Sequence, residues 1–188
     1  PELNGSQPHT DRWIFDFYED NKGNIWFGTE AGFGFFNPES QSFSNFPYPE
    51  NSKDLENIYL KECVGFANNT GNDIWVASRE SGLALFDNKN FTEPKVMLKS
   101  DTYFSNELVN KIIERKDKLY VQLKQGLSIV DKNSHNVEIF TKAFGVNQIQ
   151  NTTKNGELVI GNGFASPSKF EYDNLTPPKI YVDDLLIA

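Results

Sequence analysis

One stretch near the N-terminus decides the fold, and it reads Asp20-Asn21-Lys22-Gly23-Asn24-Ile25-Trp26-Phe27-Gly28-Thr29-Glu30-Ala31-Gly32-Phe33. A cluster of Asp, Asn and Gly is followed by a short apolar and aromatic run, and a further Gly precedes the last residue. Gly, Asn and Asp favour tight turns, whereas Ile, Trp and Phe favour strands. The stretch therefore predicts a hairpin turn, a β-strand, a second turn and the start of another strand.

The same pattern recurs along the chain. A second copy covers residues 64–87, with Trp75 in the place of Trp26, and two fainter copies cover 109–131 and 146–164. The Trp-equivalent positions 26, 75, 120 and 159 are 49, 45 and 39 residues apart. Sheets of four antiparallel strands that repeat at about this spacing are the blades of β-propellers.

We therefore predict an all-β fold of four four-stranded antiparallel propeller blades, part of a larger propeller, over residues 1–176. In the first copy the strands are expected near 14–18, 25–28, 33–36 and 43–46. The stretch 101–113 precedes and enters the third copy, and we interpret it as a loop between blades. Residues 177–188 are expected to begin a following domain or linker.

Composition excludes several functional classes. The chain has 188 residues and a formal charge of −8, whereas nucleic-acid binders carry basic stripes. No apolar run approaches the ~20 residues that a membrane span needs. A single Cys63 and two His residues offer no cluster of metal ligands, and the turn at 20–24 lacks the carboxylates of a calcium loop. We expect no metal, no cofactor, no nucleic-acid partner and no membrane contact, and we expect Cys63 to be buried.

The residues of the first copy resemble a known family. The pattern Asp-x-x-Gly-Asn-apolar-Trp-apolar-Gly-Thr-x-x-Gly-apolar of residues 20–33 is similar to the two-component-regulator propeller repeat. Residues 105–109 resemble the lead-in between blades of that family, and 177–187 resemble the entry to the Ig-like domain that follows such propellers. The chain begins at Pro1 and holds only four repeats, so we expect it to be the C-terminal part of a second, larger propeller.

The resemblance implies a function and a location. Such proteins, common in gut Bacteroidetes, are sensor histidine kinases, many of them hybrid, anchored in the inner membrane. Their periplasmic propellers respond to oligosaccharides. The resemblance therefore implies a non-enzymatic, periplasmic segment that senses or relays oligosaccharide binding, in a parent chain that is a histidine kinase.

A candidate binding face follows from strand order. The turns between the second and third strands and the long connections between blades share one face of a propeller, and long loops on a rigid scaffold are common binding sites. Aromatic side chains that stack on sugar rings, beside polar groups, suit an oligosaccharide. The candidate ligand-binding residues, each also compatible with a surface or packing role, are Arg79, Glu80, Glu30, Tyr48, Trp13 and Tyr103. Trp26 and Trp75 lie mid-strand, so we expect them to pack between blades.

Two alternatives stay open. The turn at 20–24 is also similar to the Asp-box hairpins of sialidase-like propellers, so the chain is alternatively a carbohydrate-active enzyme or a lectin-like module. The enzyme needs clustered arginines and paired carboxylates, and strand order places Arg115 on the face opposite Arg12 and Arg79. The other alternative is a structural propeller that docks proteins. The expected partners include the remaining blades and Ig-like domain of the parent, and a second copy, because open sheet edges invite pairing.

Overall fold

The computed structural model describes residues 13–47, 60–87, 89–91 and 93–141, together with four strands between 148 and 181. The described strands form four antiparallel sheets, and each sheet holds four strands in chain order. The predicted all-β propeller architecture is confirmed, and we call the sheets blades 1 to 4. No helix among the described residues has both the length and the apolar character to cross a membrane.

The bounds of the elements follow the repeat. Blade 1 contains β1 (Ile14–Glu19), β2 (Ile25–Thr29), β3 (Gly32–Asn37) and β4 (Ser42–Pro47). Blade 2 contains β5 (Cys63–Asn68), β6 (Ile74–Ser78), β7 (Gly82–Phe86) and β8 (Val96–Lys99), with a short 3-10 turn, η1 (Thr70–Asn72). Blade 3 contains β9 (Val109–Arg115), β10 (Lys118–Leu123), β11 (Gly126–Asp131) and β12 (Val137–Thr141). Blade 4 contains β13 (Gln148–Gln150), β14 (Val159–Gly161), β15 (Ser168–Glu171) and β16 (Lys179–Tyr181).

Two segments differ from the sequence-based expectation. The stretch 101–113 is not all loop, because α1 (Ser100–Tyr103) forms one helical turn and β9 begins at Val109. The strand β16 comes from the stretch 177–188, yet it pairs with β15 as the fourth strand of blade 4. The sequence showed no fourth strand before residue 177, and β16 fills that place. The domain boundary at 176 stays a prediction.

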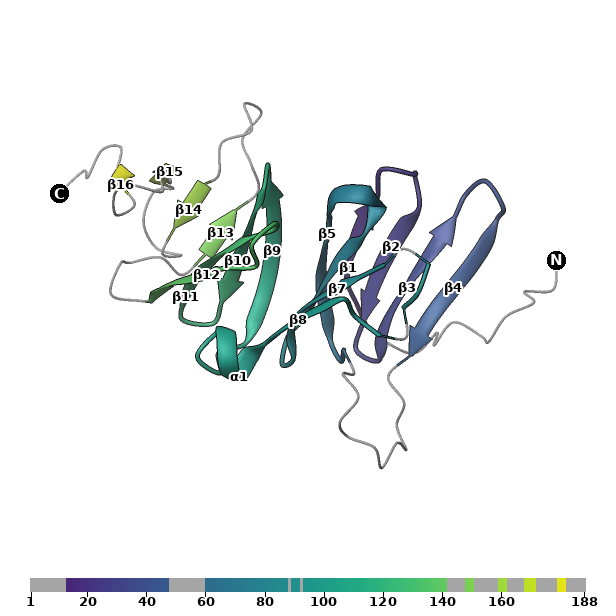
Figure 1. Ribbon diagram of the computed structural model, residues 1–188, viewed down its shortest axis with the longest axis horizontal. Coiled ribbons are helices and arrows are strands. Elements are labelled where there is room, and N and C mark those ends of the chain that lie inside the picture. The colour runs from purple at the N-terminus through teal and green to yellow at the C-terminus, as the bar shows by residue number, and fades with distance from the viewer. Residues whose placement is uncertain are drawn as a thin grey trace.

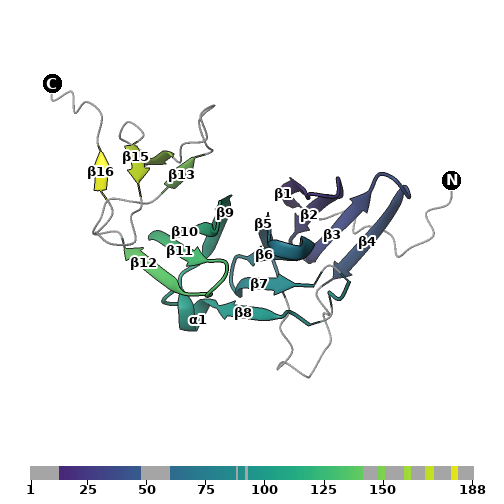
Figure 2. The same cartoon turned by 45° about the horizontal axis from the view of Figure 1, so that its top comes forward.

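The blades follow one another in an arc, from blade 1 in purple to blade 4 in yellow-green (Figure 2). The first strands of the blades lie on the inner side of this arc, where β1 is beside β5 and β5 beside β9. The fourth strands β4, β8 and β12 lie on the outer side (Figure 2). The helix α1 lies where the chain passes from β8 to β9 (Figure 1).

Neighbouring blades pack face to face, and the core lies between them. Blades 1 and 2 enclose an aromatic cluster in which Trp26 contacts Phe66, with ring centroids 5.9 Å apart. Blades 2 and 3 enclose a mainly aliphatic cluster around Trp75. Trp26 is 2% exposed and Trp75 fully buried, so their predicted packing role is confirmed. Cys63 is also fully buried, as predicted, and burial raises the pKa of its thiol.

One glycine shows how tightly the strands are joined. Gly82 opens β7 with φ +101°, a conformation that side-chain-bearing residues rarely adopt. A Cβ atom there would lie 2.1 Å from the carbonyl oxygen of Leu98 in β8. The glycine that follows the second strand of the repeat is therefore required by the backbone.

Candidate functional site

The predicted binding face is built by a repeated backbone contact. The turns β2–β3, β6–β7 and β10–β11 lie on this face, which we call the turn face. The backbone N–H of Glu62, just before β5, donates to the carbonyl of Glu30 in the β2–β3 turn, at 3.1 Å. The N–H of Val109 likewise donates to the carbonyl of Arg79 in the β6–β7 turn, at 2.9 Å. Blades 2 and 3 are thereby each joined to the turn of the blade before them.

The inner strands of blades 1 to 3 each carry a β-bulge close to the turn face. The register of β1 on β2 passes over Phe15, that of β5 on β6 passes over Val64, and that of β9 on β10 passes over Asn110. A bulge re-aims the side chain of the extra residue and bends the strand. Three blades thus place one re-aimed residue each at the same level of the inner strands.

Arg79 connects the bulges of blades 1 and 3. Its Nε lies 2.7 Å from Glu62 Oε2, so the two side chains form an ion pair. The Nε–H bond does not point at the carboxylate well enough to count as a hydrogen bond. Its Nη1 donates to Asn110 Oδ1 at 3.3 Å, and its guanidinium carbon lies 5.4 Å from the ring centroid of Phe15. The Arg79 side chain is 31% exposed. Arg79 of blade 2 therefore gathers a carboxylate, an amide and an aromatic ring from blades 1, 2 and 3.

A second charged pair lies one residue further along the inner strands. Burial raises the pKa of Asp16, while the nearby Lys111 works in the opposite direction. Gly65 stands between them in β5, and a Cβ atom there would lie 3.8 Å from Asp16 Oδ2. Asp16 of blade 1 and Lys111 of blade 3 thus interact electrostatically across β5 of blade 2.

We call Arg79 together with Phe15, Glu62 and Asn110 the Arg79 cluster. Of the six predicted binding residues, only Arg79 itself has its side chain in this cluster. Glu30 and Glu80 are exposed in neighbouring turns, and Glu30 contributes only its carbonyl. Trp13, just before β1, is 79% exposed, and Tyr103 at the end of α1 is 38% exposed. In the described part of the chain, no hydrogen bond or ion pair joins Arg79 to any of these four side chains. Tyr48 lies outside the described residues.

Three residues of the cluster were not predicted. Phe15 and Asn110 reach Arg79 because they are bulge residues, and a bulge depends on the register between strands. Glu62 has φ +49° just before β5, which brings its side chain back to the β6–β7 turn. The alignment of the repeats offers one signal for Glu62. Glu62 lies just before the second copy, at the position that Leu108 occupies before the third copy.

The opposite end of the inner strands holds a second polar cluster. The backbone N–H of Asn68 donates to Tyr18 Oη and to Glu114 Oε2, both at 3.1 Å. Lys132, 9% exposed, donates to Glu114 Oε1 and to the carbonyl of Asn68. Burial raises the pKa of Tyr18 to about 12. These residues pair with one another, so the cluster joins blades 1, 2 and 3.

Comparisons with known proteins agree with the repeat. A family model described as two component regulator propeller matches residues 8–31. No curated protein matches the sequence. The extracellular domain of a hybrid two component system from B. thetaiotaomicron is similar, with a TM-score of 0.68 at 23% identity over 95% of this chain and 25% of that one. Another such domain from this organism gives a TM-score of 0.69 at 13% identity, over 91% and 24%.

The chain spans about a quarter of the length of these solved structures. The matched residues 8–31 contain β1, β2 and the turn that β2 enters, so the resemblance seen in the sequence is confirmed for the first repeat. The likeness of fold extends to all four blades. This chain therefore carries the two-component-regulator propeller repeat, and it has the fold of the extracellular propellers of such systems.

Proposed function

We propose that this chain is an extracytoplasmic, periplasmic sensor segment of a two-component histidine kinase, in which the Arg79 cluster contacts an oligosaccharide. The observation that carries the proposal is the convergence of Phe15, Glu62 and Asn110 on Arg79 from three blades. The propeller repeat and the similar extracellular domains support the sensor role. The segment itself performs no chemistry in this proposal.

The chemistry of the cluster favours a neutral sugar. Carboxylate and amide oxygens accept hydrogen bonds from hydroxyls, a guanidinium donates to them, and an aromatic ring stacks on the apolar face of a pyranose. Arg79 is already matched by Glu62 at 2.7 Å, and the chain carries a net charge of −8. Among the residues of this cluster that the structure describes, no unmatched cation is left for a uronate or a sulfate, so we expect neutral oligosaccharides to bind better than acidic ones.

The cluster also supplies a way to transmit binding. A ligand that touches side chains of three blades favours the arrangement of blades that presents all of them together. Ligand binding then shifts the population of blade arrangements, and the shift passes to whatever domain follows the propeller.

Isothermal titration calorimetry with a panel of neutral and uronate-containing oligosaccharides tests the proposal. Arg79→Met removes the guanidinium and keeps a long side chain, and we expect at least about a tenfold loss of affinity for the neutral ligand. Arg115→Met, a change on the opposite face, is the matched control and leaves the affinity unchanged. If no sugar binds the wild-type chain, the proposal of a binding segment is wrong and a scaffold role remains. If Arg79→Met binds the sugar with unchanged affinity, the binding site lies outside the Arg79 cluster.

A further inference from the structure

Glu62, the residue directly before β5, has a left-handed backbone conformation. Its φ is +49°, a region that a glutamate adopts only at a cost in free energy. The residues around it are held in place, since Leu60 is 5% exposed and Cys63 is fully buried. Lys61 is held as well, because its carbonyl accepts the Ser78 hydroxyl. The strained residue therefore lies inside a segment that is fixed on both sides.

Three contacts keep Glu62 in this conformation. Its backbone N–H donates to the Glu30 carbonyl of blade 1 at 3.1 Å, and its carbonyl accepts the Arg79 N–H of blade 2 at 3.0 Å. Its carboxylate also forms the ion pair with the Arg79 guanidinium, at 2.7 Å. Because the N–H and the carbonyl of one residue reach different blades, Glu62 joins the β2–β3 turn to the β6–β7 turn.

Blade 3 makes the corresponding connection without a left-handed residue. The Val109 N–H donates to the Arg79 carbonyl, and the Leu108 carbonyl accepts the Lys124 N–H, both at 2.9 Å. These two groups of blade 3 belong to a single peptide unit, and neither Leu108 nor Val109 has a positive φ. The connection between blades 2 and 3 is therefore relaxed, whereas the one between blades 1 and 2 carries backbone strain.

We propose that Glu62 is a joint between blades 1 and 2, and that an oligosaccharide bound at the Arg79 cluster locks this joint in its left-handed conformation. The inference rests on the proposed function. Without sugar, the strain makes Glu62 leave the left-handed region in a fraction of the molecules, which breaks its hydrogen bond to Glu30. A sugar that contacts Glu62, Arg79 and Phe15 together binds the locked form and raises its population. Blade 1 is then held against blade 2.

Amide hydrogen exchange, followed by NMR on the 188-residue chain, tests the joint. The Glu62 amide reports the strained connection, and the Val109 amide, which makes the equivalent bond, is the control within the same molecule. Without sugar, we expect the protection factor of Glu62 to be at least about tenfold lower than that of Val109. Saturation with the tightest-binding neutral oligosaccharide of the calorimetric panel should raise it at least about tenfold and change Val109 by less than about twofold.

Variants at position 62 separate the strain from the ion pair. Glu62→Ala and Glu62→Gly both lose the carboxylate, but glycine adopts a positive φ readily. We expect the amide at position 62 to be at least about threefold better protected in Glu62→Gly than in Glu62→Ala. Glu62→Gln keeps the strain and loses the charge, so its amide should exchange faster than that of the wild type. The control is Glu80→Gln, a change at an exposed turn residue, which should leave the Glu62 amide unchanged.

The outcomes distinguish this inference from the proposed function. If no sugar binds, the proposed function and the control of the joint by sugar are both wrong. If a sugar binds and the protection of Glu62 rises no more than that of Val109, the joint alone is wrong. Equal protection of the two amides without sugar, or equal protection at position 62 in Glu62→Gly and Glu62→Ala, would also overturn it. Circular dichroism checks that each variant keeps the sheet content of the wild type.

Discussion

The carboxylate of Asp20 is the common acceptor of the first hairpin turn in blade 1. Its Oδ1 accepts the backbone N–H of Lys22 at 2.8 Å and that of Asn24 at 2.9 Å. Its Oδ2 accepts Asn24 Nδ2 at 2.8 Å and Trp26 Nε1 at 2.9 Å. Burial alone would raise the pKa of Asp20, but these four hydrogen bonds hold it below its ordinary value. The carboxylate therefore fixes the turn and the orientation of the Trp26 ring, and the predicted hairpin turn is confirmed.

Asp20→Asn tests this assignment. The amide offers one acceptor oxygen in place of two and directs N–H groups at other donors, so we expect the free energy of unfolding to fall by about 1–3 kcal/mol. Urea denaturation followed by tryptophan fluorescence measures the change. The equivalent residue of blade 2 is Asn69, whose Oδ1 has no hydrogen-bond partner. Asn69→Ala is therefore the control, with little expected change, and equal midpoints for Asp20→Asn and wild type would refute the role of the carboxylate.

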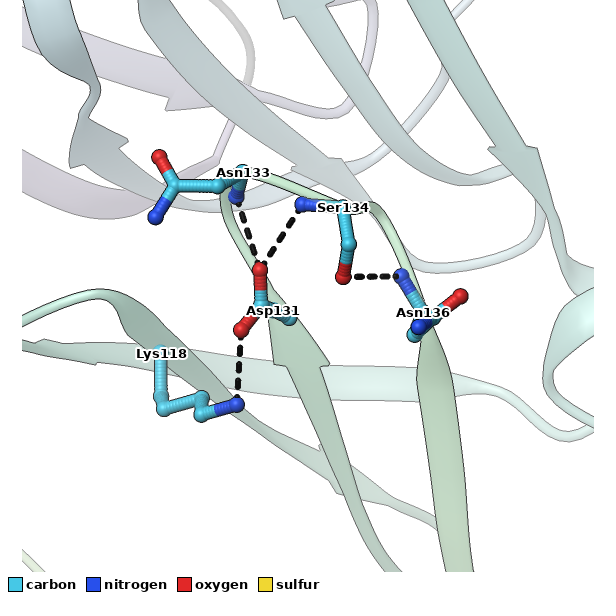
Figure 3. Close-up of polar contacts among 5 residues, drawn as sticks. All are labelled: Lys118, Asp131, Asn133, Ser134 and Asn136. Carbon is cyan, nitrogen blue, oxygen red and sulfur yellow. Dashed lines mark hydrogen bonds and ion pairs between the residues drawn. The ribbon is translucent and has the colours of Figure 1, made fainter.

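At the scale of the element, an Asn or Asp closes the turn between the third and fourth strands of blades 1 to 3. Asn37 Oδ1 accepts the backbone N–H of Ser40, and Asp87 Oδ1 accepts that of Lys89. Asp131 Oδ1 accepts two such groups, from Asn133 at 3.0 Å and Ser134 at 2.8 Å (Figure 3). An Asx residue that bonds to the backbone ahead of it favours a turn, so this position ends the third strand.

Asp131 also pairs across the strands. Its Oδ2 lies 2.7 Å from Lys118 Nζ in β10 (Figure 3). The ammonium group, together with the Ser134 and Asn133 N–H groups, holds the pKa of Asp131 well below its ordinary value. A carboxylate whose pKa is depressed in the folded state stabilises the fold above its unfolded pKa, about 4, and this stabilisation is lost as the pH falls through the folded pKa.

We therefore expect Asp131→Asn to be pH-dependent in its effect. At pH 7 the variant loses the ion pair and keeps the Oδ1 acceptor, so it should be less stable by about 1 kcal/mol. The difference from wild type should shrink as the pH drops from 4 towards 2, because the unfolded wild-type chain then takes up a proton at this carboxylate while the folded state still resists it. Urea denaturation at several pH values measures it, and a constant difference across this range would contradict the prediction. Lys118→Met should show the same narrowing.

The strands of the blades could be predicted from the sequence, whereas most of the Arg79 cluster could not. Trp26 and Trp75 sit on the same repeat position, so the strands around them and their packing role were predictable from local pattern alone. Arg79 was predictable as a residue of the turn face. Its partners Phe15 and Asn110 were not, because a one-residue bulge decides where they point and bulges arise from pairing between strands. The exposure of Phe17 was not predictable for a related reason, since Phe17 and Phe66 occupy the same repeat position but Phe17 is 63% exposed and Phe66 is buried.

At the scale of the whole molecule, the blades are coupled by contacts that cross their interfaces. Lys132 of blade 3 is buried and bonds to Glu114 and to the Asn68 carbonyl of blade 2, while the Asn68 N–H reaches Tyr18 of blade 1. In repeat proteins the total stability is a sum of repeat terms and interface terms, so loss of one interface lets a terminal part unfold separately. The cluster is thus expected to determine whether blades 2 and 3 unfold together.

Glu114→Gln tests this coupling. The change leaves the Lys132 ammonium without its counter-charge, and because Glu114 is 28% exposed we expect a loss of about 1–3 kcal/mol rather than that of a fully buried pair. In the wild type, unfolding curves from circular dichroism and tryptophan fluorescence should coincide, whereas in Glu114→Gln they should separate as blade 3 unfolds first. Adding Lys132→Met removes the unpaired charge and should restore part of the stability. Glu39→Gln, at an exposed turn of blade 1, is the control. Coincident curves with an unchanged midpoint in Glu114→Gln would show that apolar packing alone couples the blades.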